Sequence, residues 1–209
     1  MAEEFLSKNS GLDVNTLNEN EETLLELAIQ SNNLEGFKWL LKNGANPNII
    51  TKERLSSVMK LASEHENPEY LIQAILYKGD ANLSHRSGEN PLYFAAIAKR
   101  EKNVDTLISN KVDGLLVDKY NNNTFKCLIY SREYKTFNYL ILKGFEPIKM
   151  SPEIIKNIVY ELESSSSNTL PDSKEDFLKV VKYFNDHKVK VEQLTFEEFN
   201  KKYNINYPK

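Results

Sequence analysis

The sequence predicts an all-α fold, a solenoid of stacked helix pairs joined by β-turn hairpin tips. Three observations lead to this prediction. Apolar helical runs end at a glycine-like position that recurs about every 33 residues, and helix starts recur with the same period. Apolar residues make up 40 % of the 209-residue chain, which is enough to form a core. A repeat architecture buries this apolar surface by stacking neighbouring units on each other.

The first periodic series consists of helix ends. The segment LLKNGANPN (40–48) ends an apolar run with a glycine, Gly44, followed by asparagines. Similar segments place Gly11, Gly79, Lys111 and Gly144 at the corresponding position, so the spacings are 33, 35, 32 and 33 residues. A helix commonly ends at a left-handed residue, a conformation that glycine adopts without steric cost. We therefore expect a helix to end at each of these positions.

The second series consists of helix starts. Short helices are predicted to open at TLLELA (23–28), SVMKLA (57–62), NPLYFAA (90–96) and TFKCLI (124–129). Their leading apolar residues are spaced by 33, 34 and 33 residues, in phase with the helix ends. Each repeat therefore contains two helices, and the second repeat carries about two extra residues in the loop around 64–68.

The remaining third of the chain continues the period less regularly. Helices are predicted near 152–160, near 174–186 and at 195–203, with a polar serine-rich loop at 164–173 that acts as a linker or, alternatively, as a phosphorylation target. We therefore predict that residues 1–209 form a single repeat domain with terminal caps. Its parts are a half repeat at 1–16, repeats at 17–50, 51–83, 84–116 and 117–149, a degenerate looped repeat at 150–194, and a C-terminal cap at 195–209.

These segments resemble the ankyrin repeat, a 33-residue unit made of a β-turn and two antiparallel helices. ETLLELA (22–28) and GENPLYFAA (88–96) are similar to its G-x-T-P-L-H-x-A-A segment, and residues 40–48 are similar to its L-L-x-x-G-A and D/N-x-N segments. The resemblance covers residues 4–150. The sequence departs from the family pattern where a histidine is usual, at Glu26, Met59, Tyr93 and Lys126.

Charge and composition exclude several classes of function. Lys and Arg total 27 against 30 Asp and Glu, and this balance argues against a general nucleic-acid binder. No run of 18 apolar residues is present, so no membrane span is expected. The acidic N-terminus lacks the pattern of a signal peptide, and one cysteine allows no intrachain disulfide. We expect a cytoplasmic protein.

No catalytic, metal or cofactor site is predicted. His65, His85 and His187 fall in three different repeats, so a shared metal ion is not expected. His85, at a hairpin tip, is the one histidine considered for partner contact, although an ordinary surface histidine is the favoured interpretation. Cys127 lies within a predicted first helix, where a small buried hydrophobe is the favoured interpretation over a nucleophile. Glycine-rich phosphate loops are absent from the sequence.

The ankyrin resemblance implies that hairpin tips and first helices line a concave face that binds a partner. Positions were assigned by their offset from the leading apolar residue of each repeat. A centre of Arg86, Ile97, Tyr120 and Tyr130 is expected, because Tyr and Arg are enriched at binding hot spots. The full set of predicted partner-binding residues is Lys52, Glu53, Arg86, Glu89, Ile97, Lys119, Tyr120, Asn122 and Tyr130.

The sequence therefore indicates a monomeric, non-enzymatic module that binds one protein partner and occludes or scaffolds it. One version is an immunity or antitoxin protein that neutralises a cognate toxin. The alternative is a pathogen effector or a poxvirus-like host-range factor that captures a host protein. Two other classes are an enzyme with its site in 150–209 and a structural assembly unit.

Overall fold

The computed structural model of the protein describes residues 13–51, 56–85, 88–118, 120–166 and 173–205. Within these ranges the regular structure is helical, apart from one isolated bridge between Ile50 and Ser57. The predicted all-α class, with helices in stacked pairs, is confirmed. The chain divides into two compact units, Met1–Asp113 (unit 1) and Gly114–Lys209 (unit 2).

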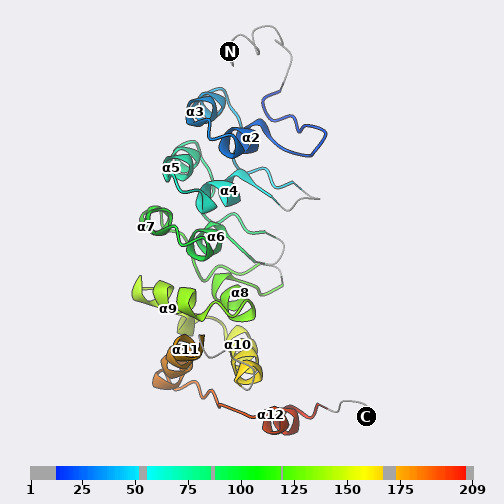
Figure 1. Ribbon diagram of the computed structural model, residues 1–209, viewed down its shortest axis with the longest axis vertical. Coiled ribbons are helices and arrows are strands. Elements are labelled where there is room, and N and C mark those ends of the chain that lie inside the picture. Colours follow the sequence, from blue (N-terminus) through cyan, green and yellow to red (C-terminus); the bar gives the residue numbers. More distant parts are fainter. Residues whose placement is uncertain (1–12, 52–55, 86–87, 119, 167–172, 206–209) are drawn as a thin grey trace. The chain divides into compact units, whose positions relative to one another are not determined.

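Unit 1 contains helix pairs stacked in two rows (Figure 1). The first helices α2, α4 and α6 pack on one another in one row, and the second helices α3, α5 and α7 form the other row. Each first helix also packs on the second helix that follows it. The bounds are α2 Leu24–Gln30, α3 Leu34–Lys42, α4 Val58–Glu64, α5 Glu69–Leu76, α6 Pro91–Ile97 and α7 Glu101–Ser109.

The first helices of unit 1 are short and are defined by their caps. Each has seven residues, a length that is marginal for an isolated helix. Thr23, Ser57 and Asn90 cap their N-termini, each side chain accepting a hydrogen bond from the backbone N–H three residues on. Each first turn buries an apolar residue, Leu25, Val58 or Leu92, and stacking against the neighbouring repeats supplies the stability that helix length does not.

A hairpin tip precedes each first helix. A backbone hydrogen bond closes each tip, from Asn18 N to Glu22 O (3.0 Å), Thr51 N to Ser56 O (3.0 Å) and His85 N to Glu89 O (2.8 Å) in unit 1. In unit 2, Asp118 N donates to Asn122 O at 2.9 Å. The tips therefore recur with the period of the helices.

Asparagine side chains link one turn of unit 1 to the next. Asn48 accepts a hydrogen bond from Asp80 N (2.7 Å) and donates one to Lys78 O (2.8 Å). Asn15 and Asn82 accept equivalent bonds, both 2.7 Å long, from backbone N–H groups 31 residues further along. These bonds explain why the second asparagine of the D/N-x-N segment recurs.

The helix ends require one correction to the sequence prediction. Gly44, Lys111 and Gly144 are left-handed as expected, but in the second repeat the left-handed residue is Lys78 (φ 68°), not Gly79. Gly79 is needed for another reason, because a Cβ there would lie 2.6 Å from Met59 Sδ and 2.7 Å from Ala74 O. Gly11 lies outside the described residues.

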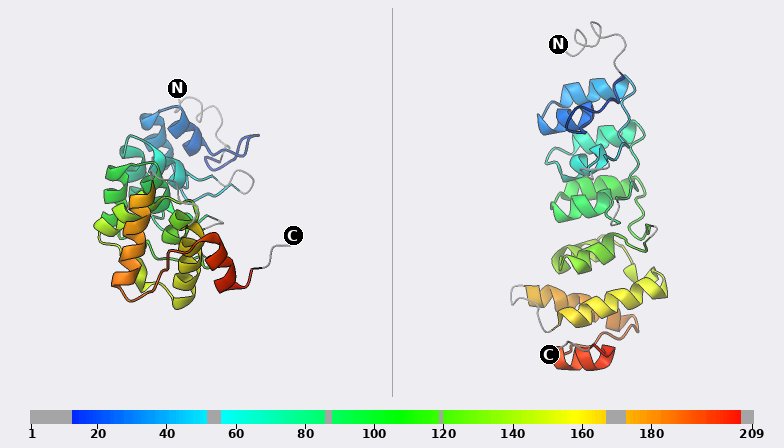
Figure 2. Two further views of the ribbon diagram at one scale, coloured as in Figure 1. Left: turned by 60° about the horizontal axis from the view of Figure 1, so that its bottom comes forward. Right: turned by 90° about the vertical axis from the view of Figure 1, so that its right-hand side faces the viewer.

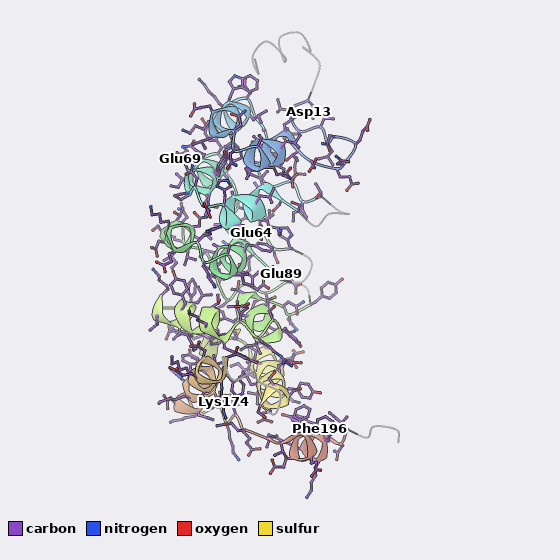
Figure 3. The ribbon with its side chains drawn as sticks, viewed as in Figure 1. Asp13, Glu64, Glu69, Glu89, Lys174 and Phe196 are labelled. Carbon is purple, nitrogen blue, oxygen red and sulfur yellow. The ribbon has the colours of Figure 1, made fainter. Side chains whose placement is uncertain are left out.

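Unit 2 repeats the stacking arrangement in its own helices (Figure 2). Helix α10 packs on α8, and α11 packs on α9, so first and second helices again stack on helices of their own kind. The last helix, α12, packs on α10. The bounds are α8 Thr124–Tyr130, α9 Tyr134–Leu142, the 3-10 turn η1 Pro147–Lys149, α10 Pro152–Ser165, α11 Lys174–Asp186 and α12 Phe196–Tyr203, with Lys174 and Phe196 marked in Figure 3.

The predicted serine-rich loop begins later than expected, because helix α10 continues into it. Ser164 and Ser165 belong to the last turn of α10, and Ser165 is buried. The Ser166 hydroxyl accepts a hydrogen bond from Leu194 N at 2.9 Å, which ties this helix end to the segment before α12. Residues 167–172 of the predicted loop lie outside the described residues. His187 is the C-cap of α11, and the residue after it, Lys188, is left-handed.

One buried carboxylate holds α12 on α10. The Glu163 side chain is 0 % exposed and accepts hydrogen bonds from Lys202 Nζ (2.7 Å), Tyr203 Oη (2.8 Å) and Glu192 N (3.0 Å). Burial raises the pKa of Tyr203, and the hydrogen bond to Glu163 raises it further, to about 12. A buried carboxylate that accepts three hydrogen bonds fixes the position of the C-terminal helix.

Candidate partner-binding surface

The predicted binding residues fall on one kind of surface, formed in each unit by the hairpin tips and the first helices. We call this surface the tip face. In unit 1 it includes α2, α4 and α6, and in unit 2 it includes the tip at 118–122 and α8. The tip face is described separately for each unit.

In unit 1 the structure describes two of the predicted binding residues. Glu89 is half-buried and marked in Figure 3; its carbonyl closes the tip before α6. Ile97, the last residue of α6, is also half-buried. Lys52, Glu53 and Arg86 lie outside the described residues.

In unit 2 two tyrosines stand out from the tip face. Tyr120 in the tip is 57 % exposed and Tyr130 at the end of α8 is 54 % exposed. The Asp118 carboxylate accepts backbone hydrogen bonds from Tyr120 and Asn122, both at 2.8 Å, and so fixes the turn that carries them. Asn122 is half-buried, and Lys119 lies outside the described residues. The exposed aromatic rings therefore flank α8 at its two ends.

Neighbouring charged groups orient Tyr130. Its hydroxyl is hydrogen-bonded to the Glu161 carboxylate of α10, and Lys126 Nζ lies 5.6 Å from the centroid of its ring. Burial raises the pKa of Tyr130, and Glu161 raises it further. Burial also raises the pKa of Glu161, an effect that the Tyr130 hydrogen bond and the charges of Lys126 and Arg132 offset in part. Tyr130 thus presents an oriented ring to the surface.

The tip-face segment of unit 2 also carries apolar residues that the sequence prediction missed. Leu116 (41 %) and Val117 (39 %) are exposed immediately before the tip that carries Tyr120. The offset rule excluded them because it counts back only six residues from the leading apolar residue. The signal that could have found them is an apolar pair directly before the tip, at the positions that Thr16 and Leu17 occupy in the first repeat.

His85 is buried, contrary to both interpretations from the sequence, an ordinary surface histidine or a residue that contacts a partner. It is only 5 % exposed, its Nε2 lies 3.0 Å from the Ser57 hydroxyl, and its ring packs against Phe94 at 5.2 Å. His85 therefore connects a tip to the N-cap of α4. His65 is bonded to Asn32, and His187 to the Tyr183 carbonyl. Cys127 is buried in α8, as predicted.

The acidic residues and histidine of the C-terminal third do not converge. Glu161 is bonded to Tyr130, Glu163 to Lys202, and Asp176 lies beside Lys179, while His187 caps α11. Asp172 lies outside the described residues. Among the residues that the structure describes, no group of His, Cys, Asp and Glu is arranged to hold a metal ion.

Comparison with known families identifies the repeats. A family model described as "Ankyrin repeats (many copies)" matches residues 6–62, a segment that includes α2, α3 and most of α4. The chain contains ankyrin repeats. The helix pairs of both units are consistent with the ankyrin pattern, and ankyrin repeats imply a protein–protein interaction module. A search of curated proteins gives no match. Each helix in the described part of the chain is too short or too polar to span a membrane.

Proposed function

We propose that this ankyrin-repeat protein binds one protein partner through the concave, tip face and occludes it. The observation that supports the proposal is the pair of exposed tyrosines, Tyr120 and Tyr130, on the face that ankyrin repeats use for contact. Tyrosine brings a large apolar area and a hydroxyl with little conformational entropy to lose, and is common at interface hot spots. Leu116 and Val117 extend the apolar contact area beside Tyr120.

The other predicted residues also take part in the proposal. In unit 2, Lys119 and Asn122 contact the partner together with the tyrosines. In unit 1, the partner-contacting residues are Lys52, Glu53, Arg86, Glu89 and Ile97. The protein acts as a monomer in a cytoplasm and carries out no catalysis. Its occluding role suits an immunity protein that neutralises a toxin, and a toxin gene beside its own gene would support this version. A viral or secretion-linked gene neighbourhood would instead support capture of a host protein.

A pull-down with matched variants tests the binding face. We expect the wild-type chain to recover one specific protein, and Tyr120→Ala/Tyr130→Ala to lose at least about 2 kcal/mol of binding free energy, roughly a thirtyfold weaker complex. Leu142→Ala is the control, because Leu142 is the most exposed large apolar side chain on α9, in the other row of helices. Equal recovery by the double variant would show that the tip face of unit 2 is not the contact surface.

A further inference from the structure

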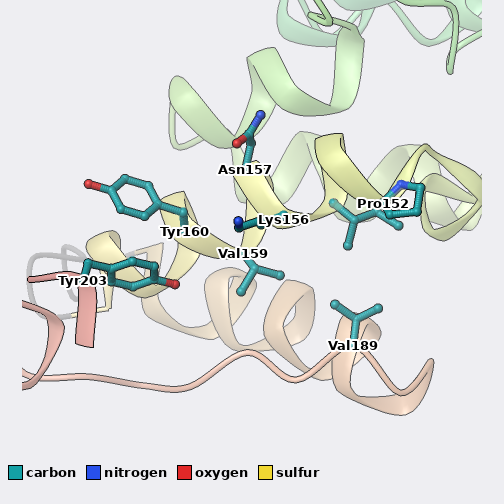
Figure 4. A pocket seen from close by; sticks show the side chains of 8 residues that line it. Pro152, Lys156, Asn157, Val159, Tyr160, Val189 and Tyr203 are labelled. Carbon is teal, nitrogen blue, oxygen red and sulfur yellow. The ribbon is translucent and has the colours of Figure 1, made fainter.

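An apolar groove runs along α10 in unit 2 (Figure 4). Ile155, Val159 and Tyr160 of α10 form one wall, and Val189 and Tyr203 form the other, around a volume of about 600 Å³. Figure 4 shows Val159 and Val189 pointing toward each other across the opening. The groove contains none of the predicted partner-binding residues, because it is lined by residues of α10, α12 and the segment after α11.

The groove continues an interface that the chain itself fills with an amphipathic helix. Helix α12 lays Phe199 and Tyr203, four residues apart, against Tyr160, with ring centroids 5.2 and 4.8 Å away. Its hydrogen bonds to Glu163 fix it on the C-terminal half of α10. The N-terminal half, from Pro152 to Val159, presents the same kind of apolar surface, and α12 does not extend over it.

The positive charge of Lys156 at the groove favours a helix with acidic side chains. Lys156 is the charged residue among those that line it, and it makes no ion pair within the described part of the chain. An apolar groove with a cationic side chain at its edge complements a helix that has a carboxylate beside its apolar stripe. A basic helix would place like charges together.

We propose that this groove, lined by α10, Val189 and Tyr203, binds an acidic amphipathic helix of a partner protein. The bound helix lies beside α12, inserts apolar side chains spaced three and four residues apart between Val159 and Val189, and places a carboxylate against Lys156. This surface gives the protein a second contact besides the tip face.

A peptide pair and a charge reversal test the proposal. The probe is a synthetic helical peptide of about 16 residues, with leucines in the i, i+3, i+4, i+7 pattern and glutamates beside them; its twin has lysines in place of the glutamates. We expect the acidic peptide to bind the full chain about fivefold more tightly than its twin, and Lys156→Glu to reverse that order. Lys135→Glu, at an exposed position on α9, is the control and leaves the preference unchanged.

The outcomes are separable. Binding is followed by fluorescence anisotropy, and the fold of each variant by circular dichroism. We expect Val159→Asp to weaken the binding of both peptides. If that variant does not fold, Lys156→Glu, at an exposed position, still tests the proposal. Equal binding of the two peptides, no binding, or an unchanged preference in Lys156→Glu overturns the proposal. A dimer seen by light scattering that Lys156→Glu dissociates also overturns it, because a second copy then covers the groove.

Discussion

At the scale of single residues, the sequence pattern predicts the structure where a side chain makes the same hydrogen bonds in each repeat. An asparagine recurs at the last position of the D/N-x-N segment because its side-chain amide is both a donor and an acceptor. Asn48 uses both groups, donating to a carbonyl and accepting from an N–H of the next turn. His85 shows the opposite case. The sequence places it in a tip, but the bond to Ser57 and the ring of Phe94, which bury it, arise from tertiary contacts that no local pattern records.

Replacing Asn48 tests whether the bonds between turns stabilise the stack. Asn48→Ala removes both hydrogen bonds, so we expect the free energy of unfolding to fall by about 1–2 kcal/mol, measured by urea denaturation. Asn110→Ala is the matched control, because the Asn110 side chain donates only within its own helix, to Thr106 O at 2.8 Å. We expect the control to lose at most about 0.5 kcal/mol. Equal losses in the two variants would contradict a special role for Asn48.

At the scale of elements, periodicity predicts the helices well because capping and burial act together. The segments expected at 174–186 and 195–203 correspond to α11 and α12. The Thr195 side chain caps α12 by accepting a hydrogen bond from Glu198 N, whereas Ser173 precedes α11 without such a bond and the buried face of α11 defines that helix. The end of α10 was predicted too early, because Ser164 and Ser165 favour caps and turns by propensity. Burial of Ser165 and the Ser166 bond to Leu194 override that preference.

The left-handed helix ends give a stability prediction at this scale. Lys111 has φ 59°, a conformation that costs a residue with a Cβ about 1 kcal/mol relative to glycine. We therefore expect Lys111→Gly to raise the free energy of unfolding by about 1 kcal/mol in urea denaturation. Lys111→Ala removes the same exposed side chain but keeps the Cβ, so it should bring no gain. A gain of equal size in both variants would mean that the side chain, not the backbone, determines the change.

At the scale of the whole molecule, the sequence predicts the class of fold and the kind of surface better than the composition of the site. The 33-residue period indicates stacked helix pairs, and the offset rule found the exposed Tyr120 and Tyr130. It missed Leu116 and Val117, which precede the positions it counts, and it missed the hydrogen bond of Tyr130 with Glu161, which joins α8 to α10. The groove along α10 was also unpredicted, because it depends on how far α12 extends.

The most direct test of the central claim is hydrogen–deuterium exchange of the full chain with and without the protein that it recovers in the pull-down. The account predicts slower exchange, on binding, for the backbone amides of the tip at 118–122 and for the end of α8 at Tyr130, with α9 and α11 unchanged. Protection confined to α9 and α11, with none at the tip or at α8, would contradict it.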